Sequence, residues 1–319
     1  MAPTWWRLPL PVDVRFVQDA RCGCGKNTRM NKTASTPIER AADFIWRNAR
    51  LLERTIFARA FLNGSSEAVI AALNAYRNPD GGFGNALEAD IRAPGSTPLA
   101  CESALRALRE ADIRDLVLAS GMCEFLASVA EPDGRVEIAL PHILDFPRAA
   151  HWDSPSFGSD SPNPTAGIAG LLHYQGADHR WLAQADEWCW RRLERPLSDA
   201  HEIATALRFL EYAPERARAA DLAIRLAIDA PRSKWFLERA GTSDYGVTPL
   251  RLCPRSTSIA RPAFSDDLIG AHLDDLASRQ QPDGGWPITW QAPGDGAATE
   301  WRGRLTLEAL LCLRAYGRI

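Results

Sequence analysis

Two acidic side chains lie close together in a loop that leads into a predicted helix. Glu88 and Asp90 both fall within residues 84–92. A carboxyl group buried beside a second carboxylate keeps its proton to a higher pH, because burial and like charge both raise its pKa. Such a group can protonate an alkene or an ether, with Asn85 of the same loop as a substrate contact. The alternative interpretation is a solvated loop in which one of the two acids pairs with Arg92.

A histidine near the start of a later predicted helix could accept a proton. His201 lies two positions after Asp199 and directly before Glu202. An unperturbed histidine titrates near neutral pH, so His201 is a candidate general base. Asp199 and Glu202 have the spacing of a helix N-cap and its partner, and this capping role explains the two acids without chemistry.

Three residues before the last predicted helix combine an acid, an aromatic ring and a guanidinium. They are Glu300, Trp301 and Arg302. Glu300 could receive a proton, while Trp301 and Arg302 could anchor a polar substrate group, since a tryptophan face over a cation contributes roughly 0.5 to 2 kcal/mol. The alternative is a structural contact between the last and the first units of the fold, because aromatic and arginine side chains also dominate structural interfaces.

Two long segments without helical periodicity are candidates for covering a binding site. Residues 137–164 include Trp152, and residues 241–265 include Tyr245. Loops of this length in a compact domain are usually lids or binding loops, or else disordered. We expect both segments to cover the mouth of a cavity, with Trp152 and Tyr245 as substrate contacts.

A repeated turn indicates which elements would bring these loops together. Residues 78–84 (Asn-Pro-Asp-Gly-Gly-Phe-Gly), 131–135 (Glu-Pro-Asp-Gly-Arg) and 281–287 (Gln-Pro-Asp-Gly-Gly-Trp-Pro) are copies of one turn. The first two copies are 53 residues apart and the last two 150, close to three more units of the same length. A period near 50 predicts a repeat architecture, here of about six helical hairpins. An aromatic residue after the turn is expected to pin it.

From residue 36 onward, helix signals recur and no alternating strand pattern is found. Thr36 and Glu39 form a predicted capping box with proline at the first helical position. Segments after the turns, such as 165–172, are apolar and rich in small residues, whereas segments before them, such as 186–192, carry charge on one face. An inner ring of helices covered by an outer amphipathic ring explains this alternation. The predicted fold is all-α, a single α/α toroid over residues 36–319.

The third turn carries a family resemblance. Residues 281–286 are similar to the Gln-Trp repeat of terpenoid cyclases, and residues 78–83 form a degenerate copy with asparagine and phenylalanine in those places. The chain resembles the prenyltransferase and squalene-cyclase repeat superfamily, whose members form α/α toroids with a central cavity. The resemblance implies acid-initiated cyclisation or isomerisation of an isoprenoid or similar apolar small molecule. The acid would be Glu88 or Asp90, with His201 or Glu300 receiving a proton.

The catalytic signatures of that superfamily are missing from the chain. No Asp-x-Asp-Asp acid or zinc-binding pattern is present, and neither 266–267 nor 274–275 completes an Asp-Asp-x-x-Asp magnesium signature. Two other functions therefore stay open. One is a carbohydrate-active α/α-barrel hydrolase or lyase, which would need an open polar groove with two carboxylates and aromatic platforms. The other is a non-catalytic binder of a lipid-like ligand.

Composition excludes several classes of partner. The 319 residues carry a formal charge of -3, so no basic surface for nucleic acid is expected. No apolar run reaches the length of a membrane-spanning helix. Seven cysteines, an odd number, favour buried thiols in the cytoplasm. We expect no cofactor and no metal, because the Cys-Gly-Cys at 22–24 lacks a second pair of ligands. Residues 1–35 are predicted to be a disordered leader or upstream extension, and the oligomeric state stays open.

Overall fold

The computed structural model describes residues 35–153 and 159–319. In these residues all regular structure is helical, with twelve α-helices, four short 3-10 helices and no β-strand. The predicted leader, apart from Ser35, lies outside the described residues. The first helix of each hairpin is α1 (Pro37–Asn48), α3 (Ser66–Asn74), α5 (Leu116–Val129), α7 (Arg180–Leu193), α9 (Arg216–Asp229) and α11 (Asp266–Ser278). The second is α2 (Leu51–Phe61), α4 (Pro98–Glu110), α6 (Thr165–Gln175), α8 (Ala200–Tyr212), α10 (Pro249–Leu252) and α12 (Asp295–Ala315). The 3-10 helices are η1 (Pro141–Asp145), η2 (Ala150–Trp152), η3 (Ala230–Arg232) and η4 (Arg261–Ala263).

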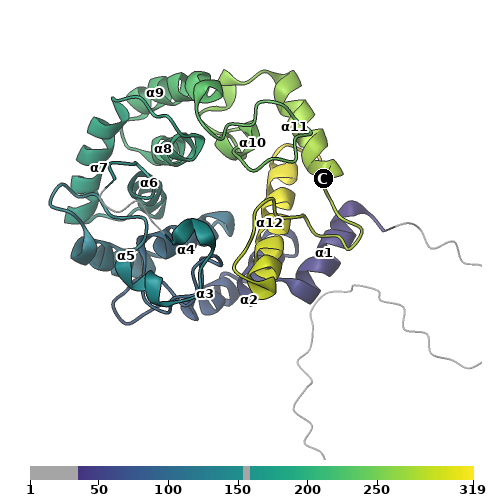
Figure 1. Ribbon diagram of the computed structural model, residues 1–319, viewed down its shortest axis with the longest axis horizontal. Helices are drawn as coiled ribbons and strands as arrows, with labels where there is room; N and C mark the ends of the chain where they lie inside the picture. The colour runs from purple at the N-terminus through teal and green to yellow at the C-terminus, as the bar shows by residue number, and fades with distance from the viewer. Residues whose placement is uncertain (1–34, 154–158) are drawn as a thin grey trace, which may run out of the picture. The chain divides into compact units, whose positions relative to one another are not determined.

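The helices form a double-layered ring. Figure 1 shows α4, α6, α8, α10 and α12 around the middle, with α3, α5, α7, α9 and α11 outside them. Each inner helix from α2 to α10 contacts the next, and α12 contacts both α1 and α2, so the last hairpin meets the first. The predicted α/α toroid of about six helical hairpins is confirmed.

The three repeat turns have one backbone structure. In each, the carboxylate of the aspartate accepts a hydrogen bond from the backbone N–H two residues on, at 2.9, 3.1 and 3.1 Å for Asp80, Asp133 and Asp283. The glycine that follows each aspartate has a φ of 85°, 90° and 92°, a left-handed conformation that other residues adopt only with strain. The three tracts are therefore copies of one turn in space as well as in sequence.

These glycines also explain how neighbouring hairpins join. A Cβ added at Gly81 would lie 2.4 Å from the carbonyl oxygen of Gly121 on α5. A Cβ added at Gly284 would lie 2.0 Å from the carbonyl oxygen of Arg40 on α1. Each turn thus presses its backbone against the next outer helix, and the third turn does so on the first helix of the chain. This contact closes the ring.

The close contact between Gly284 and Arg40 predicts that a methyl group at Gly284 strongly destabilises the fold. Gly284→Ala combines a left-handed φ with a backbone clash, so we expect it to lower the free energy of unfolding by about 3 kcal/mol. Gly241 is the matched control, because its φ is +85° and nothing lies within 4 Å of the added Cβ. Gly241→Ala should cost only about 1 kcal/mol of strain. Urea unfolding of both variants tests this, and equal costs would contradict the close contact.

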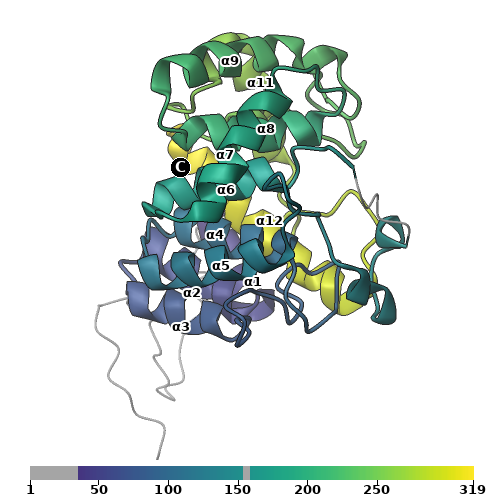
Figure 2. The same ribbon diagram turned by 90° about the vertical axis from the view of Figure 1, so that its left-hand side faces the viewer.

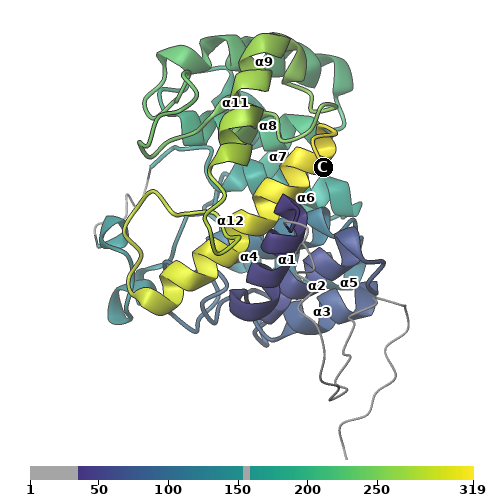
Figure 3. The ribbon, with the colours of Figure 1, turned by 90° about the vertical axis from the view of Figure 1, so that its right-hand side faces the viewer.

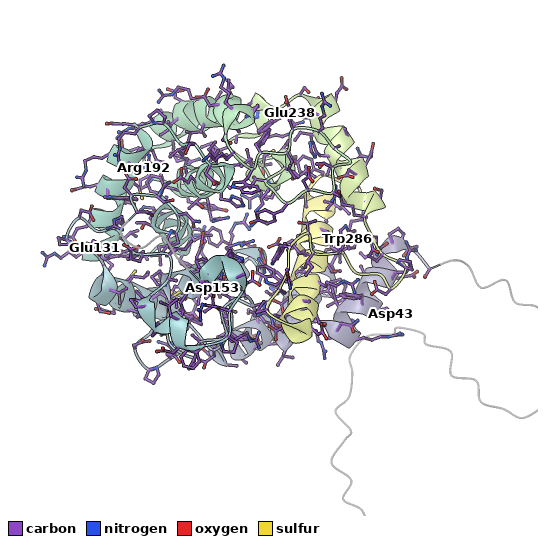
Figure 4. The ribbon with its side chains drawn as sticks, viewed as in Figure 1. Asp43, Glu131, Asp153, Arg192, Glu238 and Trp286 are labelled. Atoms are coloured by element: carbon purple, nitrogen blue, oxygen red, sulfur yellow. The ribbon has the colours of Figure 1, made fainter. Side chains whose placement is uncertain are left out.

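The aromatic residues after the turns are buried as expected. Phe83 is fully buried, and Trp286 is 4% exposed. The Trp286 indole N–H donates to the carbonyl of Leu276 on α11 at 2.7 Å, and Figure 4 shows this side chain beside α12. The second turn has no aromatic of its own, and Trp181 of α7 donates to the carbonyl of Gly134 at 3.1 Å instead. An aromatic side chain therefore pins all three turns.

The inner helices differ from the sequence prediction in one respect. Helix α6 is apolar and almost entirely buried, as predicted. Helices α4, α8 and α12, however, turn charged side chains such as Glu102, Arg208 and Arg304 toward one another across the ring. Side chains project into the middle of the ring in Figure 4. An inner helix of a toroid packs its apolar residues against the outer layer, which leaves one face toward the axis free to be polar. In the described residues no helix is both long and apolar enough to cross a membrane.

Candidate functional site

Several loops that precede inner helices meet at one end of the ring. Figures 2 and 3 show the long connections gathered at this end together with the first turns of α12. The loop before α4 carries Glu88 and Asp90, and the loop before α12 carries Trp290. We call this end the mouth. It brings together residues that are up to about 200 positions apart in the chain.

Asp90 is held in place by two tryptophans. Its side chain is buried, with the residue 4% exposed. Oδ1 accepts a hydrogen bond from the indole N–H of Trp301 at 2.8 Å, and Oδ2 accepts one from Trp290 at 3.2 Å. The imidazole Nε2 of His151 lies 3.8 Å from Oδ2. Burial raises the pKa of Asp90, while the indole donors and His151 oppose this by stabilising the charged form. Asp90 is therefore a fixed carboxylate at the mouth.

Glu88 has a different environment from its neighbour. It lines a cavity of about 30 Å³ with Ser103, Arg106 and Trp301. Its contact with the Ser103 hydroxyl is long, at 3.4 Å. Burial, and then the charge of Asp90, raise the pKa of Glu88 from 4.5 to about 7. A carboxyl group with this pKa is partly protonated at neutral pH and can donate a proton, as required of a general acid.

The loop that carries both acids is strained and is held by an arginine. Asn85 and Ala86 have φ values of 54° and 60°, a left-handed conformation that costs free energy for residues other than glycine. Arg50, at the start of α2, donates to the carbonyls of Ala86 at 3.3 Å and Leu87 at 2.9 Å. The same guanidinium forms two hydrogen bonds with Glu53, the shorter at 2.6 Å. This anchor fixes the backbone from which Glu88 projects.

The raised pKa of Glu88 predicts that Glu88→Gln stabilises the fold at alkaline pH. The folded protein binds the Glu88 proton more tightly than the unfolded chain does, and this tighter binding stabilises the fold. The stabilisation is complete below about pH 4.5 and is lost as the pH rises through about 7. The loss is on the order of 3 kcal/mol. Urea unfolding at about pH 5 and pH 8 should show the wild type weakening relative to Glu88→Gln. A pH-independent difference would contradict the shift.

His201 lies on the other side of the mouth in a hydrogen-bonded chain. Asp199 is the N-cap of α8, and its Oδ1 accepts from both the backbone N–H and Nδ1 of His201 at 2.8 Å. With Nδ1 as the donor, Nε2 is the acceptor and receives the Tyr245 hydroxyl at 3.0 Å. Burial lowers the pKa of His201, so the ring is mainly neutral at pH 7. The capping interpretation of Asp199 holds, and the same carboxylate orients His201.

Stacked and edge-on aromatic rings connect the two sides. Tyr245 stacks on His201, with ring centroids 5.5 Å apart. Trp290 contacts Tyr245 at 5.9 Å and Trp301 at 5.0 Å, both edge to face. Trp235 meets the other edge of Tyr245 at 6.0 Å. These four aromatic residues line the mouth from the Asp90 side to the His201 side.

Arg92 has a partner other than the one expected. It forms two hydrogen bonds with Glu300, at 2.6 and 3.3 Å, and none with Glu88 or Asp90. The alternative in which Arg92 pairs with one of the loop acids is therefore wrong. The guanidinium of Arg92 instead pairs with the carboxylate of Glu300 on α12. Glu300 lines the same cavity as Glu88, but its carboxylate is occupied by an ion pair.

The segment with Trp152 packs onto the acidic loop. The backbone N–H of Arg92 donates to Pro147, and that of Ala149 donates to Asp90, at 3.0 and 2.9 Å. Trp152 packs with a small apolar cluster that includes Ile91, and its ring lies 5.2 Å from that of His151. The described part of residues 137–164 thus covers the loop that carries the acids. Trp152 helps to hold this segment against the loop by packing on its apolar cluster.

Two predicted substrate contacts lie elsewhere. Arg302 donates twice to Asp283 of the third turn, both at 2.8 Å, and its guanidinium lies 4.6 Å from the centre of the Phe44 ring on α1. These contacts belong to ring closure, the alternative that the sequence left open. Asn85 is exposed and donates to Asn78 of the first turn at 3.1 Å. The structure therefore does not bring Arg302 or Asn85 to the cavity beside Glu88.

Below the mouth, ion pairs join the inner helices to one another. Arg304 donates to both Glu110 and Glu308, and Arg106 donates to Glu308. Arg208 pairs with Glu102. Burial favours the neutral form of Glu308, but the surrounding arginines hold the pKa of this carboxyl below its usual range. The interior is therefore charged, and the cavity at its upper end has room for about one water molecule.

Sequence reasoning missed Trp290, Arg50 and Arg106. Trp290 follows the third turn at the place in the repeat where Leu87, the neighbour of Glu88, follows the first turn, so superposing the repeats would have found it. Arg50 and Arg106 have no comparable signal, because a single arginine on an amphipathic helix is typical of a solvated face. Within the described ranges, no group of three or more histidine, cysteine, aspartate or glutamate residues could hold a metal ion.

Comparison with known proteins shows a similarity of fold to one solved structure. No family model matches the chain, and no curated protein matches it significantly. Among solved structures, a protein from Actinoplanes is 18% identical with a TM-score of 0.54, over 88% of this chain and 98% of that one. The two share a fold. A variant of the type II terpene cyclase MstE from Scytonema, solved with its substrate geranylgeranyl dihydroxybenzoate, is 11% identical with a TM-score of 0.46, over 86% of this chain and 97% of that one.

Proposed function

We propose that the mouth of the toroid is an active site in which Glu88 acts as a general acid on a polar, sugar-like substrate. The observation that carries this proposal is the unequal environment of two neighbouring carboxyl groups. Asp90 accepts two indole N–H bonds that favour its charged form. Glu88 lies in a small cavity, where burial and the charge of Asp90 outweigh the opposing effects of Arg50, Arg106 and the backbone N–H of Asp90. Two carboxyl groups with environments that separate their pKa values are the usual arrangement for acid catalysis at neutral pH.

The substrate class follows from the lining of the site. A cavity of about 30 Å³ encloses neither an isoprenoid chain nor a sugar ring, so a substrate of either class would lie at its opening, where the wall includes the charged groups of Arg50, Glu53 and Arg106. Hydrocarbon packed against such groups would displace water from them and offer no hydrogen bond in return, which is unfavourable. A sugar ring offers hydroxyl groups to the charges and an apolar face to Trp301 and Trp290. The carbohydrate-active alternative therefore fits this site better than a terpenoid cyclase.

A hydrolytic reaction assigns a role to each group. Glu88 would protonate the oxygen that leaves as the C–O bond breaks, and the Asp90 carboxylate would stabilise the positive charge that develops on the carbon. Water would attack that carbon and pass its proton to Tyr245 and then to His201 Nε2, with Asp199 stabilising the imidazolium. The His201 imidazolium then releases its proton to solvent, and solvent returns a proton to Glu88.

One observation favours the isoprenoid alternative. The row of Trp290, Trp301 and Tyr245 rings could stabilise a carbocation, since aromatic faces attract cations. In that reaction Glu88 would protonate an alkene at the mouth, and the proton would return through Tyr245 and His201. A third function, binding of a lipid-like ligand without turnover, requires no acid.

A direct comparison of substrates tests the proposal. Purified protein should be incubated with neutral and acidic oligosaccharides and, separately, with linear prenyl alcohols and diphosphates. We expect cleaved sugar chains, detected as new reducing ends, and unchanged prenyl substrates. Cyclised prenyl products without sugar cleavage would overturn the proposal in favour of the isoprenoid alternative. The absence of any product would favour a non-catalytic binder.

A further inference from the structure

One tryptophan at the mouth is exposed on a strained backbone. Trp235 has a φ of 64°, in the left-handed region that bulky residues rarely adopt. The residue is also 54% exposed, so burial in the core does not explain why tryptophan occupies this position. A strained conformation costs free energy and persists only where the surrounding structure holds it. Such strain is often found where a side chain must be held ready for a ligand.

Backbone hydrogen bonds on both sides hold the strained residue. On one side, the N–H of Lys234 donates to the carbonyl of Ser198 at 2.8 Å, and the carbonyl of Lys234 accepts from Ala200 at 2.9 Å. On the other side, the carbonyl of Trp235 accepts from the N–H of Val247 at 2.8 Å. The backbone at Trp235 is thus fixed between the segments that lead into α8 and α10.

Trp235 and Tyr245 form a continuous aromatic surface at the opening of the mouth. Their ring centroids are 6.0 Å apart with the planes inclined at 69°, and both residues are exposed. The Trp290 ring contacts Tyr245 in turn at 5.9 Å, and its indole N–H donates to Asp90. The three rings therefore lead outward from the acidic loop, and Trp235 is the exposed end of the row.

An exposed row of aromatic rings suits a sugar chain. The C–H face of a sugar ring packs on a flat aromatic side chain while its hydroxyl groups stay in water. A hydrocarbon chain on the same rings would keep much of its surface in water, which limits the gain from its burial. Because the row continues beyond Tyr245, it offers contact area to more sugar units than those beside Glu88.

We propose that Trp235 forms a second sugar-binding subsite, which holds the part of an oligosaccharide that extends beyond the bond cleaved beside Glu88. This inference rests on the proposed function and narrows its substrate to chains longer than the two units that flank the cleaved bond. The fixed backbone lowers the cost of ordering the indole ring when the chain binds. Trp235 is a binding residue and takes no part in proton transfer.

Binding of sugar chains to a variant that cannot cleave them tests the inference. Glu88→Gln should be titrated by calorimetry with neutral and acidic oligosaccharides, each in a series of increasing chain length. We expect the affinity to rise with length. Adding Trp235→Ala should weaken the binding of the longer chains about 3- to 10-fold and leave that of disaccharides unchanged. Trp235→Phe in its place should recover part of the affinity, because phenylalanine keeps a flat ring.

The matched control is Trp46→Ala on α1, made in the same Glu88→Gln background. Trp46 is exposed to a similar extent, at 46%, but its ring packs edge-on against Phe57 of α2. This control should bind chains of every length as Glu88→Gln does.

Two results would overturn the subsite while leaving the proposed function in place. One is equal binding of long chains with and without Trp235. The other is equal weakening at every chain length, because Trp235 would then only support the Tyr245 ring. If no oligosaccharide binds, the subsite and the proposed substrate class both fail. Length-dependent binding through Trp235 of chains that the wild type does not cleave would support the subsite and overturn the proposed hydrolysis.

Discussion

Replacing Glu88 by glutamine is expected to lower turnover by about 10²- to 10⁴-fold, the usual contribution of a general acid. Glutamine keeps the size of the side chain and its place in the cavity but cannot donate the proton. In the wild type, the rate should also fall as the pH rises through about 7, because only protonated Glu88 is active. The variant should lack this alkaline decline. Initial rates from about pH 5 to pH 9 measure both effects.

Asp145→Asn is the matched control for Glu88→Gln. Asp145 belongs to η1 in the segment that covers the acidic loop, and its side chain is exposed. Removing this charge should leave the turnover and the pH profile unchanged. If Glu88→Gln also keeps full turnover, then Glu88 is not the acid, and the unequal carboxyl environments have a structural explanation instead.

Replacing Arg304 by methionine is expected to lower the free energy of unfolding by about 3 to 5 kcal/mol. Arg304 is 8% exposed and bonds Glu110 and Glu308 at once. Methionine fills a similar volume but leaves two carboxylates in the interior with fewer partners, and an unpaired buried charge is costly. Chemical denaturation measures this loss.

Two further variants separate the charge effect from packing. Arg47→Met removes an ion pair with Asp43 in which the side chains are 74% and 67% exposed, so it should change stability by less than about 0.5 kcal/mol. Adding Glu110→Gln to Arg304→Met removes one of the stranded carboxylates and should recover part of the loss. A loss of less than about 1 kcal/mol in Arg304→Met would contradict a buried charge network.

Local signals in the sequence predicted most of the fold. The capping box of Thr36 and Glu39 is present with both of its hydrogen bonds. The Pro-Asp-Gly turns end outer helices because proline, aspartate and glycine each favour the turn for a local reason. The ring follows because repeated hairpins of equal length can bury their apolar faces only against each other.

The site was only partly predictable, for reasons of geometry. The loops before inner helices must meet at one end of a toroid, which is why Glu88, Asp90, His201 and Trp301 lie around the mouth. Which side of α12 each residue takes depends on the rotation of that helix, so Trp301 reaches Asp90 whereas Arg302 reaches the third turn. Charged stripes such as those on α4 also have the periodicity of a surface helix, and no pattern shows that they face a closed axis.

Titration of the Glu88 side chain tests most directly whether this group is the general acid. The carboxyl carbon of Glu88 should be followed by NMR from about pH 3 to pH 9, with Glu88→Gln identifying the signal. We predict a midpoint at about 7, which would leave the group partly protonated at neutral pH. A midpoint close to the ordinary value of 4.5 would contradict it, because Glu88 would then be ionised and could not serve as the acid.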